Sequence, residues 1–102
     1  EVLYFGRNRA GGGAVSDDEW STFLDQVLTP RFPAGLTVVS AVGRWQGKSG
    51  VTEQEQSQVV TIFHPGTDAD RRAVSEVTAE YKRRFQQEAI LREEMPTCAR
   101  FE

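Results

Sequence analysis

The sequence has little of what small enzymes and disulfide-stapled domains usually contain. Cys98 is the only cysteine and His64 the only histidine among 102 residues. One cysteine excludes an internal disulfide, and neither residue has a partner at the spacing of a metal site. No catalytic triad, cofactor-binding or metal-binding motif is recognisable. The sequence therefore predicts no catalytic residue, no metal and no cofactor, and it leaves open whether the protein is an enzyme.

Basic residues and long apolar runs are also scarce. The chain has 12 basic and 15 acidic residues, a net charge of -3, and the two signs are interspersed. This balance opposes a nucleic-acid footprint and a polybasic membrane patch. No apolar run approaches the ~20 residues of a membrane-spanning helix. We expect contact neither with nucleic acid nor, by the folded domain, with a membrane.

Two short runs are apolar except for Thr61, and two longer ones are mixed. Val2–Phe5 and Val59–Phe63 lack the alternation of a half-exposed strand, so both are predicted to be interior strands. Leu36–Gln46 contains Ser40, Gly43 and Arg44, and Ala89–Met95 contains three consecutive charged residues. These two segments are predicted to be strands at the edges of the sheet.

Two segments have the sequence pattern of a helix start. Ser16 precedes Glu19 by three residues, and Thr67 precedes Asp70 by the same spacing, as in a capping box. Apolar residues then recur at helical spacing, and they are predicted to form one buried face of each helix: Trp20, Phe23, Leu24, Val27 and Leu28 in the first, Val74, Val77, Tyr81 and Phe85 in the second. Pro30 and Pro33 are expected to end the first helix.

The resulting order predicts an α+β fold of the ferredoxin-like βαββαβ type. In this fold a four-stranded antiparallel sheet has its first and third strands at the centre and both helices on one face. At this length we expect a single domain over residues 1–102, since ~60–70% of the surface of such a chain is buried on folding. A glycine-rich loop over residues 6–14 and a long hairpin connection over residues 47–57 are expected within it.

The apolar central strands raise the question of what covers the second face of the sheet. Two helices shield only one face, so we expect a second copy of the protein to cover the other, giving a homodimer. The long hairpin folded back over the sheet is the alternative. We assign Leu3, Phe5, Val60, Ile62 and Leu91 to the helix side. The open face then presents Tyr4, Thr61, Phe63, Ile90, Arg92 and Trp45.

Other side chains are candidates for binding. Arg7 and Arg9 lie in the glycine-rich loop before a helix, where an anion is favoured, but the capping box and the acidic residues at 17–19 oppose one. Arg31 is braced between Pro30 and Phe32, and we expect its partner to be internal: a helix-end carbonyl or an acidic side chain. Cys98 is expected to be a half-buried apolar residue.

His64 is expected to be a structural or surface residue, although its ordinary pKa suits a general base. The homodimer described above is expected to be a non-enzymatic binding module that self-associates through the open face of its sheet. The alternative is a small enzyme or ligand carrier of the dimeric ferredoxin-like barrel type. That function requires a cavity of roughly 300 Å³ or more, bordered by Tyr4, Trp45, His64 or Arg92. The ligand itself is not identified by the sequence.

Separated motifs over nearly the whole chain resemble a bacterial family known only as a domain of unknown function, DUF3574. The matching residues are Leu3-Tyr4-Phe5-Gly6-Arg7, Val15-Ser16 with Glu19-Trp20, the run Thr29 to Val38, Gly43 with Trp45, and Tyr81 with Phe85, Gln87 and Glu88. The resemblance implies a small exported or lipid-anchored protein made with a signal segment. The absence of an initiator Met leads us to expect that an upstream segment has been removed. The resemblance brings no activity or active site with it.

Overall fold

The structure is a computed structural model that describes all residues 1–102, and its element order is the predicted one. The strands are β1 (Val2–Gly6), β2 (Thr37–Gln46), β3 (Thr52–Thr61) and β4 (Leu91–Glu93). The helical segments are α1 (Asp17–Phe23), η1 (Leu24–Leu28), α2 (Thr29–Arg31) and α3 (Asp68–Phe85). The strands form one antiparallel sheet in the order β2-β3-β1-β4, which confirms the ferredoxin-like arrangement with β1 and β3 central.

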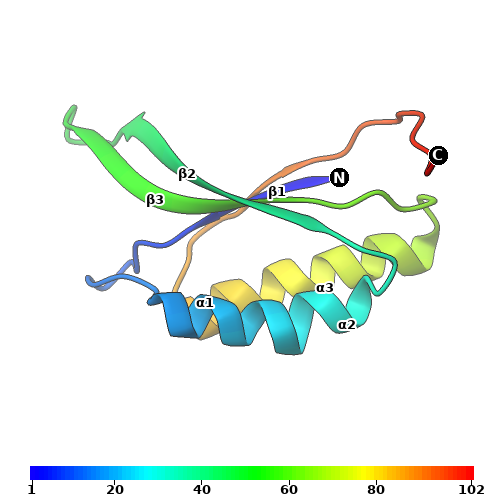
Figure 1. The fold of residues 1–102 in the computed structure, drawn as a ribbon. Helices are drawn as coiled ribbons and strands as arrows, with labels where there is room; N and C mark the ends of the chain where they lie inside the picture. Colours follow the sequence, from blue (N-terminus) through cyan, green and yellow to red (C-terminus); the bar gives the residue numbers. More distant parts are fainter.

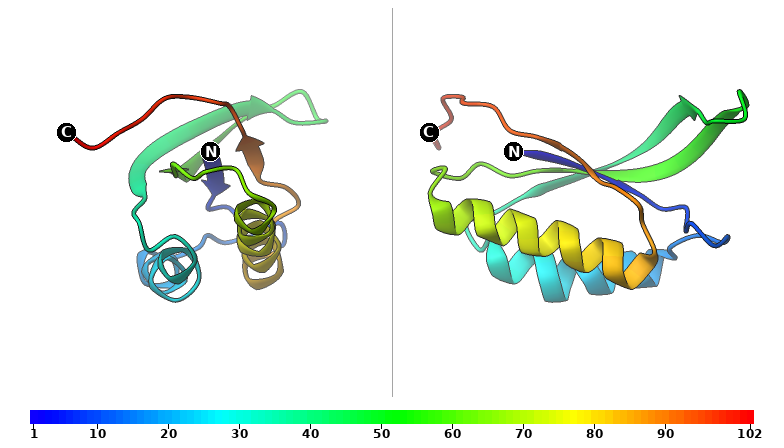
Figure 2. Two further views of the ribbon diagram at one scale, coloured as in Figure 1. Left: turned by 90° about the vertical axis from the view of Figure 1, so that its right-hand side faces the viewer. Right: turned by 180° about the vertical axis from the view of Figure 1, so that it is seen from behind.

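Both helical layers lie on the same face of the sheet, as predicted. Viewed end-on, the segment α1–η1–α2 and helix α3 run side by side beneath the strands (Figure 1, Figure 2). Both capping boxes are present: the Glu19 N–H donates to Ser16 Oγ at 3.1 Å, and the Asp70 N–H donates to Thr67 Oγ1 at 3.1 Å. The two helix starts were therefore correctly predicted from local sequence.

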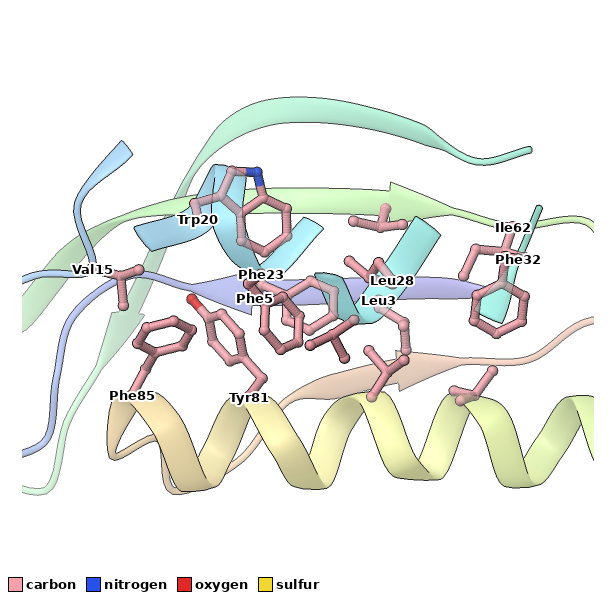
Figure 3. Close-up of a cluster of buried hydrophobic side chains, with 14 residues drawn as sticks. Leu3, Phe5, Val15, Trp20, Phe23, Leu28, Phe32, Ile62, Tyr81 and Phe85 are labelled. Carbon is pink, nitrogen blue, oxygen red and sulfur yellow. The ribbon is translucent and has the colours of Figure 1, made fainter. Parts of the chain in front are cut away.

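The core lies between the sheet and the helices. Leu3, Phe5, Val60 and Ile62 are almost completely buried, as expected for the helix-facing side chains of the two central strands. Aromatic rings dominate one end of this core: Phe5 lies 4.8 Å from Tyr81 and 6.0 Å from Phe23 between ring centroids (Figure 3). The Tyr81 hydroxyl donates a 2.7 Å hydrogen bond to the Gly6 carbonyl, so this polar group is satisfied within the core.

The first helix does not end before Pro30, contrary to the prediction. A π-helical turn, η1, precedes the proline, and the Thr29 N–H donates to the Leu24 carbonyl five residues back. Pro30 then occupies the first turn of α2, where a missing N–H costs little. The helical segment consequently runs to Arg31.

The expected connection over residues 47–57 is mostly strand. β2 and β3 pair without interruption from Thr37↔Thr61 to Gln46↔Thr52, which leaves only Gly47 to Val51 as the turn. The prediction was wrong because residues 52–57 are polar on both faces. That pattern suits a ribbon that projects beyond the helices with water on each side (Figure 1). The hairpin does not fold back over the sheet.

The last strand is shorter than predicted, and its faces are reversed. Only Leu91–Glu93 are in the sheet, with Tyr4↔Leu91 and Leu3↔Arg92 as partners. Directly paired residues point to the same side, so Leu91 lies on the open face and Arg92 on the helix side. A strand this short has no apolar alternation from which the orientation could be read, and a one-residue error reverses every side chain.

Candidate functional site

One row of apolar side chains crosses all four strands on the face that the helices leave open. Its members follow from the pairing Leu91↔Tyr4, Tyr4↔Val59 and Val59↔Val39. Leu91 is 67% exposed, Val39 56% and Tyr4 36%. The adjacent side chains of the two central strands, Leu3 and Val60, point to the other face and are buried under the helices. The exposed residues are therefore apolar side chains near the centre of the sheet, on the face that no helix covers. We call Leu91, Tyr4, Val59 and Val39 the open-face row.

The open face continues along the projecting hairpin. Trp45 pairs with Glu53 and has the same parity as Val39, so the register places it on the open face, as predicted. Its side chain is exposed. The charged residues of this face are Glu53, Glu55 and Glu93, and no basic side chain of the strands shares it. The face is therefore an apolar centre with an acidic margin.

A separate cavity of about 630 Å³ lies at the end of the sheet where β3 leaves it. One wall is formed by Ile62 to Gly66, and the other by the extended C-terminal segment from Glu94 to Phe101. Both chain ends lie at this end of the molecule (Figure 1). Phe63 and Phe101 are exposed aromatic side chains in its lining, and His64 lines it too.

Glu1, Arg92 and His64 form a hydrogen-bonded network beside this cavity, and Arg92 Nη2 also donates to Glu94 at 3.0 Å. The carboxylate of Glu1 is completely buried and accepts two hydrogen bonds from Arg92, with Nε to Oε2 at 2.8 Å and Nη2 to Oε1 at 3.1 Å. His64 Nε2 lies 3.1 Å from Glu1 Oε1. The Gly66 N–H donates to His64 Nδ1 at 3.0 Å. Since Nδ1 is the acceptor, Nε2 carries the proton and donates to Glu1.

This network favours a structural role for His64. Both ring nitrogens are occupied, so neither is free to accept a proton from a substrate. Burial raises the pKa of Glu1, but the hydrogen bonds from Arg92 and His64 outweigh burial and leave the pKa of that carboxyl below its ordinary value. The network joins the start of β1, β4 and the loop after β3, and thereby fixes one wall of the cavity.

The two arginines of the glycine-rich loop are engaged internally. Arg7 donates to the Val15 carbonyl at 2.9 and 2.7 Å and to Asp17 at 2.7 Å. Arg9 pairs with Glu19 and lies over the Phe85 ring at 5.3 Å. Hydrogen bonds from Arg9 and from Ser16 lower the pKa of Glu19, the backbone of Ser16 being the larger cause. The guanidinium groups therefore brace the loop against the helix start.

Arg31 has the internal partners that were expected of it. Its Nη1 donates to the Val27 carbonyl at 3.0 Å, and its Nε donates to Glu76 of α3 at 3.2 Å. The residue thus satisfies a carbonyl at the π-helical turn and ties the two helical segments together. Cys98, expected to be half-buried, is exposed.

The predicted site residues lie in two regions of the structure. Tyr4 and Trp45 share the open face, but Trp45 lies six residues along β2 from Val39, the β2 residue in the row of Tyr4. Phe63 and His64 line the cavity, and Arg92 lies beside it, bound to Glu1. Sequence reasoning missed Val39, Val59 and Leu91 in the open-face row, and Glu1 in the network. Alternation in residues 36–46 could have indicated Val39, but Glu1 and Leu91 are placed only by strand register.

Two possible features are absent from the structure. No helix is both long and apolar enough to span a membrane. No group of three or more His, Cys, Asp or Glu side chains is placed to hold a metal ion.

Comparison with known proteins identifies a family but no activity. The sequence profile described as "Protein of unknown function (DUF3574)" matches residues 1–101. Among solved structures, the chain is similar to one described as a phage SAM lyase in complex with S-methyl-5'-thioadenosine, with a TM-score of 0.61 and 18% sequence identity. The likeness covers 87% of this chain and 73% of that one, and at this identity it concerns the fold alone. No curated protein matches the sequence.

Proposed function

Because the chain belongs to the DUF3574 family, whose function is unknown, we propose its function from its surfaces: it is a binding module that self-associates through the open face of its sheet. The observation that supports this proposal is the open-face row. Leu91, Tyr4, Val59 and Val39 form a band across the full width of the sheet, on the side without helices. A second copy supplies an identical band, as a two-fold interface requires.

The magnitude of apolar burial sets how tight this association is. Burying a large apolar side chain completely is worth about 1.5–3 kcal/mol. Leu91, Val39 and Tyr4 are partly exposed, so each contributes about 1 kcal/mol, and Val59, which is less exposed, contributes less. The eight side chains, four from each copy, therefore give about 6–7 kcal/mol. Association costs about 4–15 kcal/mol in lost freedom. We therefore expect a concentration-dependent dimer, not a permanent one.

The test is to place a charge in the row. Leu91→Lys puts an ammonium group at one end of the band, where face-to-face packing would have to desolvate it. Val51→Lys is the matched control, because Val51 lies in the hairpin turn and is 62% exposed, close to the 67% of Leu91. Light scattering at increasing concentration should show a lower average mass for Leu91→Lys than for wild type and Val51→Lys, because only Leu91→Lys loses the face-to-face contact.

Two results contradict the proposal. One is a wild-type protein that stays monomeric at submillimolar concentration. The other is a Leu91→Lys variant that associates as well as wild type, since an ammonium group cannot be accommodated within a packed apolar band. Circular dichroism of each variant establishes that the fold is retained.

A second candidate function is supported by the cavity. Its volume of about 630 Å³ exceeds the minimum expected for a ligand carrier and is bordered by His64, one of the residues named for that purpose. The protein of similar fold is described as a lyase that holds S-methyl-5'-thioadenosine. We propose that the cavity takes a small ligand with a planar aromatic part, which Phe63 and Phe101 would contact.

This candidate is tested with S-methyl-5'-thioadenosine as the probe. A ligand at one hundred times its dissociation constant stabilises the folded state by about 2.7 kcal/mol, which is visible as a raised melting temperature. Phe63→Ala should abolish the shift, whereas Val51→Ala, at the same 62% exposure, should preserve it. No shift in wild type, or an equal shift in Phe63→Ala, contradicts binding of this probe in the cavity.

A further inference from the structure

The two edges of the sheet are unequal. β4 has three residues, two of them charged, so this edge is short and polar. β2 has ten residues, TVVSAVGRWQ, with no proline and a single charge at Arg44. Natural sheets protect their edges with short strands, prolines, bulges or several charges, because an open edge pairs with other strands. β4 has such protection and β2 does not.

The outward-facing backbone groups of β2 have no partners. Every hydrogen bond of residues 37–46 in the backbone network belongs to the ladder with β3, and none of the turn, loop or cap bonds involves this strand. Half of the N–H and C=O groups of β2 therefore point away from the sheet, in a row ~30 Å long. No side chain from elsewhere in the chain donates to them or accepts from them.

We propose that β2 is a pairing edge that binds the β2 strand of a second copy in the antiparallel direction, joining two sheets into one of eight strands. The edge pairing is separate from the face-to-face association of the open-face row, because it uses the rim of the sheet and not its surface. The two contacts can therefore fail independently.

The sequence of β2 complements itself in one register. With Val42 on the two-fold axis, Val39 of one copy is opposite Trp45 of the other, and this pair occurs twice on the open face. Aromatic and β-branched residues are favourable cross-strand partners. Arg44 is then opposite Ser40, so no two like charges meet. A shift that placed Arg44 on the axis would oppose two guanidinium groups.

The two-fold axis of the edge contact is also compatible with that of the face-to-face contact. An antiparallel edge contact has its axis perpendicular to the sheet, so both helical layers stay on the same side. The axis of a face-to-face contact lies in the plane between the sheets. If the two axes intersect at right angles, they generate a closed assembly of four copies. A second copy is consequently a compatible occupant of both the edge and the face.

The edge contact alone is small. A seam that is ~30 Å long and one strand thick buries less surface than the ~800 Å² per partner of a standard stable interface. We therefore expect edge pairing to be reversible and to appear as protein concentration rises.

The first test is Val42→Lys. Val42 is 51% exposed and lies on the helix-side pleat beyond the helices, so the substitution leaves the open-face row untouched. In the proposed register it places two ammonium groups directly opposite each other on the axis. We expect sedimentation velocity to show an edge-contact dissociation constant raised at least about tenfold. The comparison is made in a chain that also carries Leu91→Lys. This second substitution removes the face contact, so any remaining association reports the edge contact alone.

The second test is a cross-link, which does not depend on the stability of the Val42→Lys variant. In a Cys98→Ser background, Val42→Cys places two thiols opposite each other at the axis, ~4.5–5.5 Å apart between Cβ atoms, close enough to bridge with a small adjustment. Ser40→Cys is the control, because its two copies are offset by four residues, about 13 Å. Oxidation should give a covalent dimer from the first variant and little from the second.

Three outcomes overturn the edge pairing. They are a wild-type protein that remains monomeric at submillimolar concentration, a Leu91→Lys dimer that Val42→Lys does not weaken, and equal cross-linking through Ser40→Cys and Val42→Cys. If Leu91→Lys has no effect while Val42→Lys dissociates the protein, the face-to-face proposal fails and the edge pairing stands. The opposite pattern removes the edge pairing and leaves the face contact.

Discussion

One hydroxyl group within the aromatic core is hydrogen-bonded to the backbone of β1. Tyr81 donates to the Gly6 carbonyl at 2.7 Å, and its ring lies 5.1 Å from Phe23 and 4.9 Å from Phe85. Tyr81→Phe keeps the ring and removes the hydrogen bond, so we expect a loss of about 0.5–1.5 kcal/mol of unfolding free energy. Urea denaturation measures it. Tyr4→Phe, on the open face, is the control and should change stability little; equal effects of the two would contradict the assigned bond.

Burial also makes Tyr81 responsive to alkaline pH. Burial raises the pKa of its hydroxyl, so the folded state favours the neutral form. The unfolded chain releases this proton near pH ~10, and stability is therefore retained below that pH and lost above it. This loss should be smaller in Tyr81→Phe.

The Glu1–Arg92 pair predicts the opposite behaviour in acid. The pKa of the Glu1 carboxyl is lowered in the folded state, so its contribution to stability is present above its unfolded pKa and is lost as pH falls through the folded value. Arg92→Met removes the stronger of its two partners and leaves a buried carboxylate, whose pKa burial then raises. We expect a loss of about 2–3 kcal/mol at pH 7, below the ~3–5 of a fully buried pair because Arg92 is partly exposed.

The pH dependence separates this effect from simple loss of packing. Below pH ~5 the wild type should lose stability as it takes up the proton, whereas Arg92→Met should lose less or become more stable. Chemical denaturation at several acidic pH values measures both curves. Parallel curves would show that Arg92 does not control the ionisation of Glu1.

At the scale of elements, the helix starts are the features that local sequence specifies best. The Ser16 hydroxyl accepts from the Glu19 N–H, and the Glu19 carboxylate accepts from the Ser16 N–H at 3.1 Å. Ser16→Ala should cost about 1 kcal/mol of unfolding free energy, since an N–H at the helix start loses its partner. Ser21→Ala is the control, at an exposed position within the same helix, where alanine is favourable. A similar effect of both substitutions would contradict the capping role.

Elements that depend on distant partners were harder to predict. The capping boxes are recognisable within a few residues and were correctly placed. The apolar parts of the central strands were recognised too, but β3 spans Thr52–Thr61 and not the predicted Val59–Phe63. The polar hairpin residues 52–57 form a strand only because β2 lies beside them. Pro30 stays helical only because the π-helical turn makes room for it. The orientation of β4 follows from its register with β1, which no pattern within three residues reveals.

At the scale of the whole molecule, the apolarity of the central strands predicted that one face would lack cover, but not which residues form the band. Tyr4 and Trp45 were correctly assigned to the open face. Arg92 was not, because its partner Glu1 is brought to it by the β1–β4 ladder. Of the residues named from the sequence as the border of a cavity, only His64 lines the observed one, since its walls come from the loop after β3 and the C-terminal segment. Packing geometry, and not composition, creates both surfaces.

The shape of the molecule implies uneven local stability, which hydrogen exchange can measure. The sheet above the helices contains the buried residues of β1 and β3, whereas the hairpin beyond it has no core beneath it (Figure 1). Amides of Leu3–Phe5 and Val59–Thr61 should therefore exchange only on global unfolding, and those of residues 41–46 and 52–57 by local opening.

Protein concentration should change this pattern in one strand. If β2 pairs with a second copy, its outward-facing amides gain partners, and exchange in residues 38–46 should slow as concentration rises. Residues 52–55 of β3 pair with β2 alone. Their outer backbone groups lie outside the proposed seam, so their exchange should slow less. Val42→Lys should abolish the concentration dependence while leaving the exchange of the central strands unchanged. Equal slowing of both arms of the hairpin would indicate that association covers the sheet face without pairing its edge.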